Sequence, residues 1–174
     1  MDRTERYMGR IINCKVGDLV VNYDRFRKPL SSREREKRKG PYPYYGATCI
    51  FDYIDDYIFD GDYILLGEDG TVINEDGSPV LQRITGKTWV NNHAHVLQNT
   101  ERIDFDYLYY ALKNSRFNSA VTGAVQPKIS QANMNAVVLR IHEDIVEQKK
   151  IARYLLAIDE RINLNNKINE NLVA

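Results

Sequence analysis

The sequence is poor in cysteine, carries no net charge and has no long apolar run. Its two cysteines, Cys14 and Cys49, lie far apart and form no C-x-x-C pair, so the sequence indicates neither a zinc site nor a disulfide framework. No run approaches the roughly 18 apolar residues of a membrane span, and the charged N-terminus MDRTERYMGR lacks the apolar core of an export signal. We therefore expect a soluble cytoplasmic protein with no membrane partner.

Signatures of nucleotide and cofactor chemistry are also missing. The sequence contains no Asp/Asn-Pro-Pro-aromatic tetrad, which would hold an adenine amino group, and no glycine-rich cofactor loop after a strand. A phosphate loop of the form G-x-x-x-x-G-K-[ST] is absent as well. We therefore predict a non-catalytic chain with no catalytic residue, no metal ligand and no cofactor of its own.

What the chain has instead is an uneven distribution of charge. Its 24 basic and 24 acidic side chains balance overall, but residues 25–39 hold eight basic residues against two acids. Such a cluster favours binding to a polyanion, although a charge run can also be no more than a solvated surface. The eight residues are Arg25, Arg27, Lys28, Arg33, Arg35, Lys37, Arg38 and Lys39.

Residues 40–70 alternate tyrosines and aliphatic side chains with polar groups between glycine-marked turns, which predicts paired strands at the centre of the fold. Strands are also predicted at 17–22, 71–74, 79–84, 88–97 and 135–140. Turn residues between several of these runs favour a meander of short antiparallel strands. Five aspartates in the central stretch suit a solvated turn that joins two strands: Asp52, Asp55, Asp56, Asp60 and Asp62.

Three helical segments are predicted before the C-terminus. Ser31 or Ser32 can cap a short basic turn that Gly40 and Pro41 end. The apolar residues of 104–119 recur at helical spacing and predict a helix packed on the sheet. After a loop at 123–130, Ser130 can cap a further helical turn.

The last thirty residues carry a heptad pattern. A helix from about Glu143 to Leu172 would be roughly 45 Å long, which exceeds what one face of a small domain can cover. We expect it to project and pair with another helix, while packing back along its own domain is the alternative. Two asparagines in the apolar seam can fix register and partner choice. The seam is Ile151, Leu155, Ile158, Ile162, Asn165, Asn169 and Leu172.

A chain of 174 residues fits one domain with an appendage. The predicted fold class is α+β. A mainly antiparallel β domain with packed helices spans residues 1–141, and a long projecting coiled-coil helix spans residues 142–174.

The run WVNNHAHVL at 89–97 would place Trp89, Asn91, His93 and His95 on one face of a strand. Two histidines at i and i+2 can ligate a metal, and they allow a small metal-dependent nuclease that uses His93 and His95 as an alternative function. However, the sequence shows no third ligand with suitable spacing. A structural, hydrogen-bonded histidine pair is therefore favoured.

Three sequence blocks, in this order, resemble the specificity (S) subunit of type I restriction-modification enzymes. They are PYPYYGATCIFDYIDDYIFDGDYILLGEDG, WVNNHAHVL and TGAVQPKISQANMNAVVL, followed by a long helix that opens with EQKKIARYLLAIDERI. The resemblance covers the chain from about Gly9 onward. It implies a target recognition (DNA-binding) domain followed by a helix for coiled-coil pairing and subunit assembly.

Members of that family usually hold two recognition domains and two such helices, which pair antiparallel, and each domain reads one half of a bipartite target. This chain holds one of each, so we expect a half-subunit, a truncated copy or a fragment. A homodimer through the C-terminal helix, or pairing with a second half, would complete it, and a two-fold dimer would read an inverted repeat. A coiled-coil protein adaptor without DNA binding is a further alternative.

The resemblance also implies the partners: double-stranded DNA, a methyltransferase (modification) subunit and a restriction subunit. S-adenosylmethionine, ATP and Mg would then be bound by the partner subunits alone. Basic residues are the expected phosphate contacts, and amides are candidates for reading base edges, although the blocks around them can instead be scaffold. The phosphate candidates are Arg33, Arg35, Lys37, Arg38, Lys39, Lys87 and Lys128, and the base-reading candidates are Asn91, Asn92 and Gln126.

Overall fold

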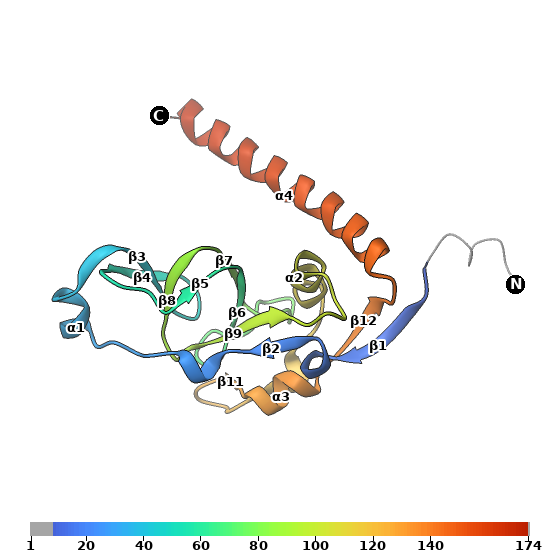
Figure 1. Ribbon diagram of the computed structural model, residues 1–174, viewed down its shortest axis with the longest axis horizontal. Coiled ribbons are helices and arrows are strands. Elements are labelled where there is room, and N and C mark those ends of the chain that lie inside the picture. Colours follow the sequence, from blue (N-terminus) through green and yellow to red (C-terminus); the bar gives the residue numbers. More distant parts are fainter. Residues whose placement is uncertain (1–8, 174) are drawn as a thin grey trace, which may run out of the picture.

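The structure is a computed structural model that describes residues 9–173, and it consists of a β-rich body and one long C-terminal helix (Figure 1). The body contains two four-stranded sheets, two two-stranded ribbons and three short α-helices within the described residues. This mixed architecture with mainly antiparallel pairing confirms the predicted α+β fold class. Across residues 9–173, no helix has both the length and the apolar composition needed to span a membrane.

The first sheet forms the centre of the core and is antiparallel throughout. Strand β6 is buried along its whole length, and its side chains alternate between two apolar clusters. Ile64 and Leu66 face one cluster, whereas Tyr63 and Leu65 face the other. In sheet order the strands are β2 (Val20–Asn22), β9 (Ala94–Asn99), β6 (Tyr63–Gly67) and β7 (Leu81–Ile84).

The second sheet lies at the end of the body that carries the basic helix. Strands β3 and β8 are parallel, and the other pairs are antiparallel. Tyr44, Ile54 and Trp89 form its own small buried cluster. The stretch 40–70 is therefore divided between two sheets, because only its last strand, β6, belongs to the first. In sheet order the strands are β4 (Ile50–Ile54), β3 (Lys39–Tyr45), β8 (Lys87–Val90) and β5 (Phe59–Asp60).

One of the two-stranded ribbons pairs the first strand of the body with its last. Strand β1 (Ile11–Lys15), which the sequence analysis missed, pairs with β12 (Val138–His142). The strand predicted at 135–140 begins later, because α3 continues to Ala136. The strand predicted at 17–22 is also shorter, since a turn of 3-10 helix, η1 (Val16–Asp18), precedes β2.

Two of the remaining strand predictions are wrong in part. Residues 71–74 form no strand and contribute only an isolated bridge between Ile73 and Pro79. The run 88–97 is split into β8 and β9 by a turn at 91–93. The side-chain oxygen of Asn91 accepts a hydrogen bond from the His93 amide at 2.8 Å, and this bond closes the turn.

The short helices begin at the caps expected from the sequence. The hydroxyl of Ser31 accepts from the Glu34 amide, and the Ser130 hydroxyl accepts from the Asn133 amide. The helix predicted over 104–119 ends at Lys113, and Phe117 is buried from the turn that follows. The remaining elements are α1 (Ser32–Glu36), η2 (Asp24–Phe26), α2 (Phe105–Lys113), η3 (Asn118–Ala120), β10 (Val121–Thr122), β11 (Lys128–Ile129) and α3 (Gln131–Ala136).

Helix α4 (Ile145–Val173) follows β12, and its C-terminal part extends away from the body (Figure 1). Its first half packs on the body, where Gln148 and Ala152 are buried and the Tyr110 hydroxyl donates to Asp159 at 2.8 Å. Residues 160–172 are all exposed. The projecting helix is thus confirmed, and packing along the whole domain is wrong. The domain boundary after residue 141 stays a prediction.

Candidate nucleic-acid interface

Helix α1 and the three residues after it carry five of the seven predicted phosphate contacts, and the helix is fixed by a capping box. Ser31 and Glu34 exchange hydrogen bonds between side chain and backbone in both directions. The hydrogen bond from the Ser31 hydroxyl is the main reason that the pKa of Glu34 lies below its ordinary value. The cap gives a helix of only five residues a defined start, and so sets the direction of its basic side chains.

Acidic residues of β4 and the turn after it neutralise part of the basic cluster. Asp52 lies 2.6 Å from the Lys39 ammonium and 3.4 Å from Arg35, and the Lys39 hydrogen bond is the first cause of its lowered pKa. Arg38 reaches Asp55 at 2.9 Å and Asp56 at 3.4 Å. These aspartates therefore form ion pairs with the basic cluster. The sequence predicted only that they would lie in a solvated turn.

Arg33 and Lys37 differ from their neighbours. Both are exposed, and neither forms an ion pair with any residue between 9 and 173. They are consequently the two cations of α1 and its C-cap that can approach an external anion without first leaving an internal carboxylate. Lys87 is the first residue of β8 in the second sheet. Its ammonium lies 4.6 Å from the Tyr57 ring centre, and a hydrogen bond to Tyr57 raises the Lys87 pKa.

The other predicted contacts lie in two segments, 91–93 and 123–128, which meet the loop after β6. We call residues 68–71, 91–93 and 123–128 the three-loop platform. The Glu68 amide donates to the His93 carbonyl at 2.8 Å, and the Gly70 amide donates to the Pro127 carbonyl at 3.0 Å. Asn92, Gln126 and Lys128 are exposed on the platform. Asn91 is buried and serves the turn described above, which supports its role as scaffold.

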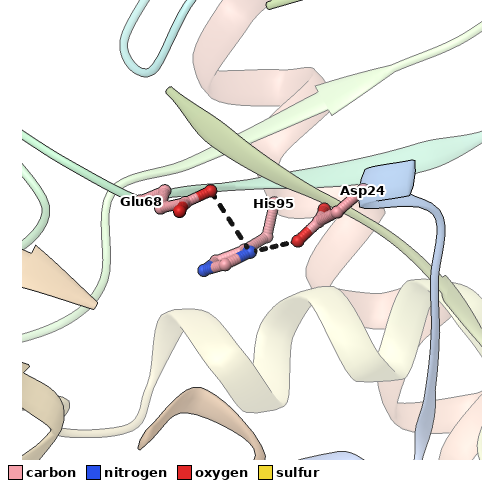
Figure 2. Close-up of side chains that lie close together, drawn as sticks. All are labelled: Asp24, Glu68 and His95. Atoms are coloured by element: carbon pink, nitrogen blue, oxygen red, sulfur yellow. Dashed lines mark hydrogen bonds and ion pairs between the residues drawn. The ribbon is translucent and has the colours of Figure 1, made fainter. Parts of the chain in front are cut away.

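An ionic network joins the platform residue Glu68 to the buried His95 and the partly buried Asp24 (Figure 2). Nδ1 of His95 is 2.6 Å from an Asp24 carboxylate oxygen and 3.8 Å from Glu68, while Nε2 is 2.8 Å from the Ile129 carbonyl oxygen. A carbonyl oxygen only accepts, so Nε2 carries a hydrogen. The Asp24 carboxylate faces Nδ1, so the ring is held between two acceptors.

Arg27 completes the network and ties it to the neighbouring turns. Its guanidinium donates to Glu68 and to the Ala94 carbonyl, both at 2.6 Å, and lies 3.4 Å from Asp24. Lys128 reaches the other oxygen of Glu68 at 3.1 Å. One arginine and one histidine thus connect η2, the loop after β6, the start of β9 and β11.

The two network carboxyls have shifted pKa values for the same physical reasons. Burial alone would raise the pKa of Asp24, but hydrogen bonding and the charge of His95 outweigh it, and the pKa is lowered. Burial acts in the same sense on Glu68, where the hydrogen bond from Arg27 and the charge of His95 prevail and lower the pKa. Both groups are therefore ionised at neutral pH.

Asp24, Glu68 and His95 bring ligand-type atoms within 4.8 Å of one another, which is close enough to be compared with a metal site. However, Arg27 and Lys128 already bind the carboxylates, and the Val96 amide donates to Asp24 at 2.8 Å. A divalent cation would have to displace the guanidinium. In addition, His93 points to a different acid, Asp69, at 2.6 Å, so the two histidines share no site.

Sequence reasoning missed Asp24, Arg27 and Glu68 as a unit. Arg27 belongs to the basic cluster noticed in the sequence, but nothing local marks it as buried. Its main partner, Glu68, is 41 residues away from it in the sequence and directly follows a strand. Only tertiary structure brings the two together.

A separate cleft of about 1120 Å³ lies between the β1–β12 ribbon, α2 and the first half of α4. It contains none of the predicted DNA contacts. Two positions of the α4 seam lie in its wall, so the cleft is continuous with the helix surface that leaves the body. The apolar and aromatic residues of its lining include Ile11, Val138, Tyr107, Tyr110, Ile151 and Leu155.

The fold is that of known specificity subunits. It matches the crystal structure of a type I restriction-modification S subunit from M. genitalium with a TM-score of 0.73 and 16% identity, over 89% of this chain and 40% of that one. An HsdS subunit from Thermoanaerobacter tengcongensis matches with a TM-score of 0.52 and 14% identity, over 88% of this chain and 38% of that one.

The chain belongs to the family of the type I restriction modification DNA specificity domain, whose model matches residues 13–174. A Haemophilus influenzae protein named as a type I restriction enzyme specificity subunit is 34% identical over 76% of this chain and 34% of its own length. The EcoprrI specificity subunit of Escherichia coli is 26% identical over 79% of this chain and 32% of its length. The chain thus spans about a third of these curated relatives.

Proposed function

We propose that this chain recognises double-stranded DNA as a specificity component of a type I restriction-modification system. The match of residues 13–174 to the specificity-domain family carries the proposal. Two exposed cations that pair with no acid among residues 9–173, Arg33 and Lys37, support it, because phosphate contacts supply most of the salt-dependent affinity of a DNA-binding protein. The ion-paired Arg35, Arg38 and Lys39 hold α1 and the residues after it against β4 and the turn that follows β4.

Methyl transfer and cleavage belong to partner subunits in this proposal. A methyltransferase subunit would bind S-adenosylmethionine, and a restriction subunit would use ATP and Mg. The chain itself would bind no cofactor, and it would act in the cytoplasm, where the DNA and these subunits are found. The continuous surface formed by α4 and the adjoining cleft is the proposed docking region for the methyltransferase.

Assembly through α4 is the second part of the proposal. Ile158 and Ile162 are 54% and 51% exposed, although they continue the seam that Ile151 and Leu155 begin against the body. A second copy would cover them and bring two recognition bodies together on one DNA. A paired helix of about 45 Å exceeds one turn of B-DNA, about 34 Å, so two half-sites can lie roughly a turn apart.

Selection from a pool of random duplexes tests DNA recognition directly. The purified chain is incubated with the pool, and the bound fraction is sequenced after several rounds. We expect one enriched motif, and an inverted repeat if the chain dimerises. A charge-reversed variant, Arg33→Glu with Lys37→Glu, should retain far less DNA of every sequence. Failure of the native chain to enrich any duplex would contradict the proposed function.

Solution mass, measured by light scattering over a range of concentrations, tests the assembly. Ile158→Ser with Ile162→Ser should convert a dimer to a monomer, because four isoleucines would leave the interface. A control with two changes on the outer face of α4, Glu160→Ser and Lys167→Ser, should stay dimeric. A native chain that is monomeric throughout would show that the helix pairs with a different second half.

A further inference from the structure

We propose that the three-loop platform reads base edges in the major groove, with Asn92, Val125 and Gln126 as the specificity-determining residues. This inference rests on the proposed DNA-recognition function and deepens it, because it separates the surface that reads sequence from the surface that binds phosphate. Four observations on the platform carry it: its continuity, its rigid support, its exposed groups and its charge.

The platform is one surface, although its loops are far apart in the sequence. The loop after β6 donates from Glu68 to the 91–93 turn and from Gly70 to the 123–128 loop, and the Ile129 amide returns a bond to Glu68 at 2.8 Å. Side chains repeat these connections, since Lys128 binds Glu68 and His93 binds Asp69. A ligand that touches one loop will therefore meet all three.

The support below the platform is unusually firm for a set of loops. His95 and Arg27 hold η2, the loop after β6, the start of β9 and β11 through one buried and three partly buried hydrogen bonds. A recognition side chain needs its backbone fixed to within about 0.5 Å, which flexible loops rarely achieve. The network fixes the chain at Glu68, Ala94 and Ile129, next to the turns that carry the exposed residues.

The exposed groups of the platform are suited to bases. The amide side chains of Asn92 and Gln126 are exposed and form no hydrogen bond with the described part of the chain. Val125, at the tip of the loop between β10 and β11, is 99% exposed. Asparagine and glutamine pair with the adenine edge in the major groove, and an aliphatic group contacts the thymine methyl.

The charges of the platform separate it from α1. Glu68 is paired to Arg27 and Lys128, and Asp69 to His93, so the platform presents little unbalanced positive charge. Phosphate attraction therefore comes from α1 and its C-cap, where Arg33 and Lys37 pair with no acid in the described part of the chain. Figure 1 shows the loop leading to β11 at the lower edge of the body, with α4 crossing above, so a duplex can approach the platform without meeting the long helix.

The test compares the motif selected from random duplexes by the native chain with that selected by the variant Asn92→Ala, Gln126→Ala. We expect the variant to lose about tenfold or more in preference at particular base pairs. Its affinity for unselected DNA and its salt dependence should change by less than about twofold. The control variant Asn114→Ala, Asn163→Ala removes two exposed amides elsewhere and should select the native motif.

Each other outcome is decisive. An unchanged motif in the Asn92→Ala, Gln126→Ala variant would overturn the inference and leave the proposed function standing. A uniform loss of affinity for all sequences would also overturn it, because the platform would then be a phosphate contact. If the native chain selects no motif at all, the proposed function fails first, and the inference fails with it.

A second measurement does not depend on the stability of the double variant. Val125 is replaced by the photo-cross-linker p-benzoylphenylalanine, and the chain is irradiated with its selected duplex. We expect a covalent adduct to a base within the motif, and none when Val146, an exposed valine on α4, is replaced instead. Cross-links from position 125 to a protein subunit only would overturn the assignment to DNA.

Discussion

Two histidines that are two positions apart in the sequence make the same short contact in different surroundings. His93 and His95 each place Nδ1 2.6 Å from an aspartate oxygen. The His93 side chain is 46% exposed and has that one partner, whereas the His95 side chain is 1% exposed and also binds the Ile129 carbonyl. The contact distance alone therefore does not determine how much an ion pair contributes to stability. That contribution depends on burial and on the cost of an unpaired buried charge.

The same contrast separates the two charged regions of the molecule. The network around His95 is buried and internally satisfied, so it stabilises the fold and fixes loops. The pairs around α1 are more exposed, and they leave Arg33 and Lys37 free for an external anion within the described structure. In our proposal, the first region holds the fold together and the second attracts DNA.

The largest effect is expected from His95→Ala. The substitution leaves the partly buried Asp24 carboxylate without its main partner, and we expect a loss of about 3 kcal/mol, the lower end for breaking a buried pair, because Arg27 and the Val96 amide remain in place. Equilibrium urea unfolding of the native chain and the variant measures the change in the free energy of unfolding. A loss below about 1 kcal/mol would show that the network is solvated in solution and would remove the contrast with His93.

Acid should weaken the same network. Burial opposes ionisation of Asp24 and Glu68, yet their partners hold both pKa values below the ordinary 3.8 and 4.5. Groups with lowered pKa values stabilise the fold above those ordinary values, and this contribution disappears as pH falls through the folded-state values. The part of the native chain's stability advantage over His95→Ala that these two carboxylates contribute should thus shrink as pH falls below about 4. An advantage that grows in acid would contradict the assigned charges.

An intermediate effect is expected from Arg38→Ala. Arg38 pairs with Asp55 and Asp56 and lies 4.9 Å from the centre of the buried Trp89 ring, but its side chain is partly exposed. Exposed pairs and cation–π contacts each contribute up to about 1 kcal/mol, so we expect a loss of about that size. Urea unfolding at low and high salt separates the two, since added salt screens only the ion pairs strongly.

The smallest effect is expected from His93→Ala, which is the matched control for His95→Ala. Removal of an exposed partner from Asp69 should change the free energy of unfolding by less than about 0.5 kcal/mol. A loss comparable to that of His95→Ala would mean that contact distance, and not burial, sets the value of these pairs.

Local signals in the sequence predicted the parts of the fold that depend on neighbouring residues. The caps at Ser31 and Ser130 and the heptads of α4 are such cases, because hydrogen bonds or side chains within a few positions specify them. Strand β1 was missed because its alternation, with Asn13 and Lys15 exposed, is only five residues long. It becomes a strand by pairing with β12, which is distant in the sequence. The split of 88–97 depends on one side-chain bond from Asn91, which strand propensity does not reveal.

The candidate interface was predictable as composition but not as geometry. The basic run was visible in the sequence, whereas its division into paired and free cations depends on Asp52, Asp55 and Asp56 folding against α1. Likewise, Asn92 and Gln126 were separate candidates in the sequence, and the fold brings their loops together. Long-range pairing of this kind leaves no periodic signal in one sequence.

The salt dependence of DNA affinity tests most directly the proposed division between a structural network around His95 and DNA-binding cations at α1. Binding of a duplex is measured by fluorescence anisotropy over a range of salt concentrations for the native chain and for Arg33→Ala with Lys37→Ala. Loss of two phosphate contacts should lower the magnitude of the log–log slope by about 2 and leave the free energy of unfolding unchanged. The control Arg153→Ala with Arg161→Ala removes equal charge from α4 and should keep the native slope. An unchanged slope for the α1 variant, or an equal decrease for the control, would contradict the account.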